Sequence, residues 1–172
     1  MGIGVAIIDF ETLFQLAMSE GTGGTATITI PYIMSPTFRL EPEFGYTSGT
    51  QKLDGIEGSN WEATTSTMNI GIGIFPQKVY DTFTLYYGAR VGYLTQKQTE
   101  EETDTDDYEA TASGFYIAPA IGGEHNFNEH FSIGAEAQFV YTSLTSEEQG
   151  QDYEIKLTLM NTRALVFFRF YF

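Results

Sequence analysis

The sequence contains no cysteine, which excludes disulfides, a thiolate nucleophile and cysteine-based zinc sites. Basic residues are also few, since eight Lys and Arg stand against 23 Asp and Glu. The resulting formal charge of −15 argues against nucleic-acid binding, because that function needs a basic surface. No apolar run approaches the roughly 20 residues that a transmembrane helix requires. The first residues lack the basic start and the long apolar stretch of a signal peptide, so we expect that an export signal has already been removed.

The chain is instead rich in glycine and aromatic residues, and its side chains alternate in character. In residues 83–95, FTLYYGARVGYLT, the odd positions are apolar or aromatic and the even positions are mostly small or polar. The same period of two recurs in residues 38–46 and 131–141. Such alternation is typical of β-strands whose two faces meet different surroundings. The length of 172 residues favours one domain, residues 1–172. The alternation assigns this domain to the all-β class.

Eight alternating segments are found along the chain, near residues 3–10, 25–34, 37–51, 61–75, 83–98, 108–124, 131–146 and 153–172. The first competes with a short helix over residues 11–18, ETLFQLAM. The last changes phase, because its apolar residues are odd-numbered around Leu157 but even-numbered from Val166 to Phe172. A β-bulge near residues 160–163 would reconcile the two phases.

The predicted connections alternate between short and long. Short turns are expected at residues 35–36, 76–82 and 125–130, and longer acidic loops at 11–24, 52–60, 99–109 and 147–153. Strands joined by successive hairpins, with short turns at one end and long loops at the other, form an up-and-down antiparallel barrel.

The charges indicate which face of this barrel lies outside. The long loops hold 17 acidic residues and two lysines, when they are drawn as residues 9–24, 51–62, 96–109 and 146–154. Their net charge of −15 equals the net charge of the whole chain. A membrane barrel has an apolar outer face and a polar lumen, whereas a lipocalin-type soluble barrel has the reverse arrangement. A soluble sandwich is a further alternative, but its wet face would be expected to carry Lys and Glu instead of Gly, Ala and Ser. We therefore predict an eight-stranded antiparallel up-and-down transmembrane β-barrel.

Six charged residues are predicted to meet inside the barrel, because they lie on the small-residue faces of their strands: Arg39, Glu41, Glu43, Arg90, Glu136 and Arg163. We expect the three arginines and three glutamates to pair as one network, since an unpaired buried charge is strongly unfavourable. Eight strands leave a lumen only wide enough for side chains. The three arginines, with Tyr86, Tyr116 and Gln138, should therefore plug it.

Aromatic residues cluster near both strand ends, as in the interfacial girdles of membrane barrels. The predicted girdles are Phe38, Phe75, Phe83, Phe127 and Phe131 at the short-turn end, and Tyr46, Trp61, Tyr93 and Tyr141 at the loop end.

The end of the chain, ALVFFRFYF, and two internal stretches carry a family resemblance. Residues 35–46, SPTFRLEPEFGY, and 85–94, LYYGARVGYL, resemble the small outer-membrane β-barrels of the OmpX and OmpA-barrel type. A last strand with apolar residues at alternate positions up to a final aromatic residue is similar to the assembly signal of that family: Val166, Phe168, Phe170 and Phe172. The resemblance implies a monomer in the outer membrane of a Gram-negative bacterium, surrounded by outer-membrane lipid, with periplasmic short turns and extracellular loops. It also implies insertion by the barrel-assembly machinery.

Few residues suggest chemistry. His125 and His130 lie in HNFNEH with Glu124 and Glu129 nearby, but a solvated turn explains them better than a metal site. Some barrels of this family modify lipid A with a His near the outer leaflet, and both histidines here are predicted at the opposite end. The carboxylates of residues 99–109, TEEETDTDDYE, are of a kind that binds Ca²⁺ or Mg²⁺. Their spacing does not match an EF-hand, so a solvated loop is favoured and divalent cations remain an alternative partner.

We therefore predict a non-enzymatic protein without cofactor or resident metal. Its expected role is structural or in surface interaction, through acidic extracellular loops. The alternatives are a narrow channel or conduit for small hydrophobic solutes and, from another class, a lipid-modifying enzyme.

Overall fold

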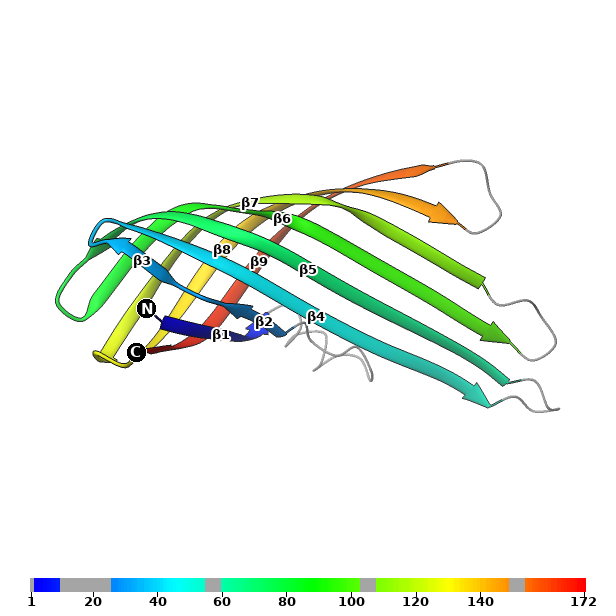
Figure 1. The fold of residues 1–172 in the computed structure, drawn as a ribbon, viewed down its shortest axis with the longest axis horizontal. Coiled ribbons are helices and arrows are strands. Elements are labelled where there is room, and N and C mark those ends of the chain that lie inside the picture. The colour runs from blue at the N-terminus through cyan, green and yellow to red at the C-terminus, as the bar shows by residue number, and fades with distance from the viewer. Residues whose placement is uncertain (1, 10–25, 55–59, 103–107, 149–153) are drawn as a thin grey trace.

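The structure is a computed structural model that describes residues 2–9, 26–54, 60–102, 108–148 and 154–172 (Figure 1). Every regular element in these ranges is a strand: β1 (Gly2–Asp9), β2 (Ala26–Thr29), β3 (Tyr32–Ser35), β4 (Phe38–Asp54), β5 (Asn60–Val79), β6 (Phe83–Glu102), β7 (Tyr108–Asn128), β8 (Phe131–Glu148) and β9 (Ile155–Tyr171). Within the described ranges, no helix is both long and apolar enough to cross a membrane.

The strand pairings return to their starting point. From β4 to β9 each strand pairs with the next, β9 pairs with β1, β1 pairs with β2, and β2 pairs with β4, always antiparallel. β2 and β3 both lie against β4 and together form the predicted second strand, which is interrupted at Pro31 because proline has no N–H to donate. Ile30 N keeps the alignment by donating to Pro42 O at 2.9 Å. The predicted eight-stranded up-and-down architecture is thus confirmed.

Several strands are longer than the alternation predicted. β5 continues to Val79, β6 to Glu102 and β7 to Asn128, so the predicted connections at these places are shorter than expected. In particular, most of the predicted acidic loop 99–109 lies on β6 and β7, with only residues 103–107 outside the description. The helix alternative at residues 11–18 lies outside the described residues, while β1 forms as a strand over Gly2–Asp9.

The predicted bulge near residues 160–163 is wrong. The register between β8 and β9 runs without a shift from Phe131 opposite Phe170 to Ser146 opposite Ile155. The phase of the apolar residues changes because the two parts of β9 have different surroundings. β1 pairs with β9 only over Leu165–Tyr171. Leu157 and Leu159 lie beyond that pairing and are exposed, so they need not follow the face that the later residues use.

The two faces of the strands have opposite character, as predicted for a membrane barrel. Ile70, Tyr87 and Phe139 point outward and are 50–60% exposed, whereas charged side chains such as Arg90 point inward and are buried. Two predicted girdle residues are misplaced, because Phe75 and Trp61 both lie on the inner face of β5. Phe75 is fully buried inside, because it lies on the same face of β5 as Gly71 and Gly73.

Glycines on the inner face make room for these large side chains. A Cβ at Gly134 would overlap the ring of Phe167, and a Cβ at Gly122 would overlap the ring of Tyr86. Both rings are buried, with exposures of 2% or less. The small-residue face recognised in the sequence is therefore the wall against which the lumen side chains pack.

At the loop end, β4–β9 continue past the residues at which the described parts of β1 and β2 close the ring (Figure 1). β2 pairs with β4 only as far as Tyr46, and β1 pairs with β9 only from Leu165 onward. Among the described residues, β4 after Tyr46 and β9 before Leu165 therefore have a strand partner on one side only. We call this part the extension: residues 47–54 of β4, residues 155–164 of β9 and the segments of β5–β8 between them.

Candidate functional site: a charged plug in the lumen

Seven charged side chains are buried together inside the ring, each 4% exposed or less, and we call them the plug: Arg39, Glu41, Glu43, Arg90, Glu124, Glu136 and Arg169. Three of them follow one another at alternate positions of β4, and the others come from β6, β7, β8 and β9. Alternation alone explains why they share the lumen, since residues two apart on a strand point to the same side.

Arg90 is the centre of the plug. Its Nε and Nη2 donate to the two carboxylate oxygens of Glu136, each at 2.7 Å, in a bidentate pair. Nη1 donates to Glu43 at 2.7 Å, and Nη2 also donates to Glu41 at 2.7 Å. One guanidinium thus binds three carboxylates from two strands, a geometry for which the planar fork of arginine is suited.

The two other arginines share a second pair of carboxylates. Arg39 Nε lies 2.9 Å from Glu41 and its Nη1 donates to Glu124 at 3.1 Å. Arg169 Nη2 lies 2.7 Å from Glu41, and its Nη1 donates to Glu124. Both guanidinium groups stack on aromatic rings, Arg39 on Tyr86 at 3.7 Å and Arg169 on Phe167 at 3.9 Å from the ring centre.

Neutral side chains supply further donors to the same carboxylates. Tyr86 donates to Glu136 at 2.8 Å and Gln138 donates to it at 2.6 Å. Tyr116 donates to Glu43, and Ser132 and Tyr171 donate to Glu124. Glu43, Glu124 and Glu136 therefore accept hydrogen bonds from neutral side chains as well as from arginines, as buried charged groups require.

The structure brings together five of the six residues predicted for the network: Arg39, Glu41, Glu43, Arg90 and Glu136. Arg163 does point into the lumen, but it is only half-buried and makes no ion pair in the described part of the chain. Its place is taken by Arg169, and Glu124 is an additional member. Glu124 lies well inside β7, because this strand ends at Asn128 and not at the turn expected from residue 125.

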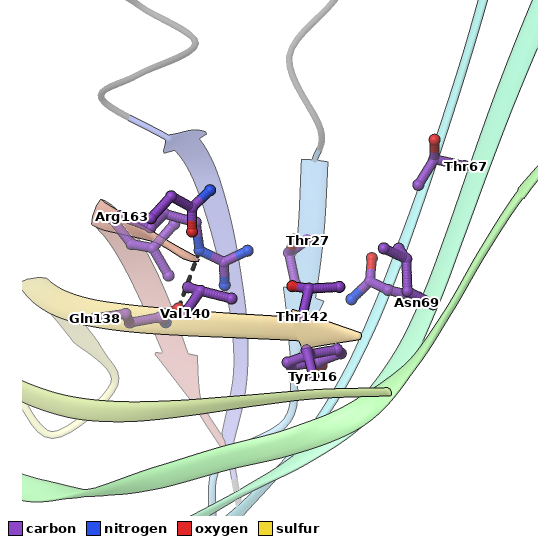
Figure 2. Close-up of a pocket in the computed structure, with 11 residues that line it drawn as sticks. Thr27, Thr67, Asn69, Tyr116, Gln138, Val140, Thr142 and Arg163 are labelled. Carbon is purple, nitrogen blue, oxygen red and sulfur yellow. Dashed lines mark hydrogen bonds between the residues drawn. The ribbon is translucent and has the colours of Figure 1, made fainter. Parts of the chain in front are cut away.

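Arg163 nevertheless reaches the plug through one neutral residue. Its Nε donates to Gln138 Oε1 at 3.0 Å, and Gln138 Nε2 donates to Glu136. The plug has one more glutamate than arginines, and Arg163 adds a positive charge beside it through this link. Figure 2 shows the bond between Arg163 and Gln138 at the wall of a cavity.

This upper cavity has a volume of about 220 Å³ and lies on the loop side of the plug. Its walls are mostly amides and hydroxyls, among them Asn69, Tyr116, Gln138 and Thr142, with Arg163 at one side (Figure 2). Leu94, Val140 and Leu165 add apolar patches.

A lower cavity of about 640 Å³ lies at the short-turn end. Arg39 and Glu124 form its inner boundary, and Gln77, Tyr171 and Phe172 lie nearer the opening. The two cavities share no residue, because the plug fills the lumen between them.

The remaining predicted site residues lie at the short-turn end. His125 is on β7, not in a turn, and its ring packs against Phe127 at 4.9 Å. His130 follows β7 and its Nδ1 lies 3.1 Å from Tyr171 O. Across the described ranges, no group of three or more His, Asp or Glu side chains is arranged to hold a metal ion.

The predicted assembly-signal residues occupy the final strand and the residue after it. Val166 and Phe170 point outward and are exposed, Phe168 is half-buried, and Phe172 is 85% exposed at the chain end. The rings of Phe168 and Phe170 both contact Phe131 of β8. Their role in assembly stays a prediction.

The chain matches the family described as "Outer membrane protein beta-barrel domain" over residues 1–162. Among solved structures, it is similar to CarO of Acinetobacter baumannii, with 11% identity, a TM-score of 0.48, and coverage of 99% of this chain and 96% of that one. It is also similar to Ail, the attachment invasion locus protein of Yersinia pestis, with 12% identity, a TM-score of 0.45, and coverage of 99% and 94%. The outer membrane protease OmpT of Escherichia coli is 11% identical, with a TM-score of 0.42, and coverage of 86% and 62%. No curated protein matches the chain.

Proposed function

The chain belongs to the family of outer-membrane β-barrel domains, and from this premise we propose that it acts at the bacterial cell surface by binding. In this proposal the ring anchors a monomer in the outer membrane and the extension carries the function. Catalysis and solute transport are not part of the proposed role.

The length of the strands is the observation that carries this proposal. β4–β9 contain 17–21 residues each, whereas a tilted strand crosses a bilayer with about 9–11. The extra residues extend the sheet at the loop end, past the last pairings of β1 and β2 in the described residues. A stiff sheet of this kind is a better binding platform than flexible loops, because its side chains are held in register.

Charge favours a basic partner for this surface. Glu101 is exposed on the extension, Glu154 is exposed directly before β9, and Glu62 and Glu109 are partly exposed on the extension. The described part of the extension carries three lysines, and two of them are paired, Lys52 with Glu62 and Lys97 with Glu109. An acidic surface attracts cationic polypeptides at long range and repels nucleic acid.

The plug argues against the alternative of a narrow channel. A solute crossing the lumen would have to separate Arg90 from three carboxylates that hold it at 2.7 Å. The channel alternative is tested by single-channel recording, which we expect to show no conductance for the wild-type protein. A lipid-modifying activity would require reactive groups near the outer leaflet, and both histidines of the chain lie at the other end.

The binding proposal is tested with a cationic peptide, decalysine, added to proteoliposomes that expose the loop end. Fluorescence anisotropy should detect binding that weakens as salt is raised, because exposed charges are screened. The double variant Glu101→Gln with Glu154→Gln should bind less peptide. Glu129→Gln is the matched control, since its carboxylate is equally exposed but lies at the short-turn end. Equal binding by all three proteins would contradict the proposal.

A further inference from the structure

The outward face of the extension repeats one order of side chains on strand after strand. On β7, Phe115 is exposed, and the next outward residues toward the loop end are Ser113, Thr111 and then Glu109. The register of β7 with β6 is unbroken over this stretch, so these alternate residues all lie on the same face as Phe115.

β4 and β5 show the same order from an exposed apolar residue to a charge. On β4, Tyr46 is followed by Ser48, Thr50 and Lys52. The neighbouring positions of β5 are Ser66 and Thr64, and the hydroxyls pair across the strands, Ser48 with Ser66 and Thr50 with Thr64, each at 3.0 Å. None of these hydroxyl residues is fully buried.

β8 and β6 continue the hydroxyl rows. Beyond Tyr141, the outward residues of β8 are Ser143 and Thr145. Thr95 of β6 lies opposite Ser113, which in turn lies opposite Thr145. The Ser and Thr residues named for these five strands form a hydroxyl belt that borders the apolar outer band without a gap.

The inner face at the same height is different. On β7 the inward neighbours of the belt are Ala112 and Gly114, and on β8 they are Thr142 and Leu144. Strand propensity alone favours threonine on either face. Hydroxyl residues do occur on the inner face of β4, β5 and β8, but there they are interspersed with Gly, Ala, Gln and Leu. On the outward face of β4–β8, every position between the apolar residue and the first charge is Ser or Thr, and this unbroken run points to what lies outside the barrel.

The height of the belt matches the headgroup layer of a membrane. Alternate residues of a strand tilted by about 45° differ in height by about 5 Å. The two hydroxyl rows directly above the aromatic residues thus cover roughly the 5–7 Å that separates the hydrocarbon of one leaflet from water.

The cations at the belt are lysines that do not form a cluster, and no arginine of the described strands lies on its outward face. Lys97 stands between Ser66 and Thr111 in the register, and Lys156 lies opposite Thr145. Phosphate sites are built from arginine and lysine clusters. On the outward face here, Lys97 is paired with Glu109 at 2.9 Å and Lys52 with Glu62 at 2.8 Å, which leaves Lys156 as an isolated lysine at the belt. Hydroxyl side chains donate and accept hydrogen bonds without charge, as the hydroxyls of sugars do.

We infer that the hydroxyl belt binds the uncharged sugar headgroups of outer-leaflet glycolipids whose acyl chains cover the apolar band below. This inference rests on the outer-membrane location of the family and not on the proposed binding of a basic partner. The belt and the lipid-facing band are continuous on the same strands, so one lipid molecule contacts both.

The test measures which lipids stay with the protein. The protein is folded into vesicles of phosphatidylcholine mixed with digalactosyldiacylglycerol, or with phosphatidylglycerol, and is extracted as nanodiscs in a membrane-solubilising copolymer. We expect the sugar lipid to be enriched over the bulk ratio by about two-fold or more, which is the ratio that one net hydrogen bond supplies. We expect no comparable enrichment of the anionic lipid.

Two variants locate the effect. The outward variant carries Thr111→Val, Ser113→Ala, Ser143→Ala and Thr145→Val, and should lose the enrichment. The inward control carries Thr47→Val, Thr65→Val, Thr67→Val and Thr142→Val, and should keep it. A gel shift on heating verifies that each variant is folded, and the pair Ser143→Ala with Thr145→Val replaces the outward variant if that one fails. An unenriched wild-type protein, a stronger enrichment of phosphatidylglycerol, or an equal loss in the inward control would each overturn the inference.

Discussion

The closed ring and the extension are parts of the same strands, but ion pairs are buried in the ring and exposed to water on the extension. In the ring, Arg90 and Glu136 lie 2.7 Å apart with side-chain exposures of 2% and 0%. In the extension, Lys97 and Glu109 lie 2.9 Å apart with exposures of 51% and 46%. The distances are nearly equal, so distance does not reveal how much each pair contributes to stability.

The surroundings decide that contribution. Inside the ring, water is excluded by Phe75, Tyr86 and Phe167, and a charge that loses its partner there cannot be solvated. On the extension, water hydrates either charge when the pair opens, and salt screens the attraction. Substitutions that remove one partner should therefore have large effects in the ring and small effects in the extension.

The largest effect is expected for Arg90→Ala. This change leaves Glu136, Glu43 and Glu41 without their central cation and should lower the free energy of unfolding by about 3–5 kcal/mol. The measurement is the urea midpoint of protein folded in vesicles, followed by the heat-dependent gel shift.

Arg163→Ala is the control, because this arginine also faces the lumen but, within the described residues, makes a single side-chain hydrogen bond, to Gln138. It should reduce the free energy of unfolding by only about 1 kcal/mol. If both variants unfold at the same urea concentration, the plug is not a stabilising network and the comparison between ring and extension fails.

The alternation of side chains was enough to predict the strands, their antiparallel order and the polar lumen. It could also have placed Phe75 correctly, since this residue has the same parity as Gly71 and Gly73. The lengths of the strands were harder to predict, because polar residues such as Thr99 and Glu100 are as common in loops as on the exposed end of a strand.

The identity of the plug arginine on β9 could not be predicted from the sequence. Arg163 and Arg169 have the same parity, so alternation puts both on the inner face. The choice between them depends on the register, which places Arg169 opposite Ser132 and Arg163 opposite Gln138. Register is set by how all the strands stagger around the ring, and no local stretch of sequence specifies that stagger.

Two glycine-to-alanine substitutions, each adding one methyl group, compare the packing of the ring with that of the extension. A Cβ at Gly134, in the ring, would overlap the buried ring of Phe167, whereas a Cβ at Gly49, in the extension, would meet no atom within 4 Å. Gly134→Ala should destabilise the protein by about 1–3 kcal/mol through overpacking. Gly49→Ala should be neutral or stabilise it by up to about 1 kcal/mol, because alanine restricts the unfolded chain more than glycine does.

The same urea midpoints report this pair, and circular dichroism checks that both variants keep their β-structure. A Gly134→Ala protein as stable as the wild type would mean that Phe167 has free space to move. The lumen would then be packed less tightly than the overlap implies.

The smallest effect is expected for the exposed pair on the extension. Lys97→Ala, Glu109→Ala and the double variant form a cycle whose coupling energy should be about 0.2–1 kcal/mol, as for other exposed ion pairs. The coupling should fall further when salt is raised, because water and ions reach both side chains. A coupling as large as the effect of Arg90→Ala would show that the outward face is shielded from water at this height. Such shielding would place Lys97 within the headgroup layer and would support a deeper position of the hydroxyl belt in the membrane.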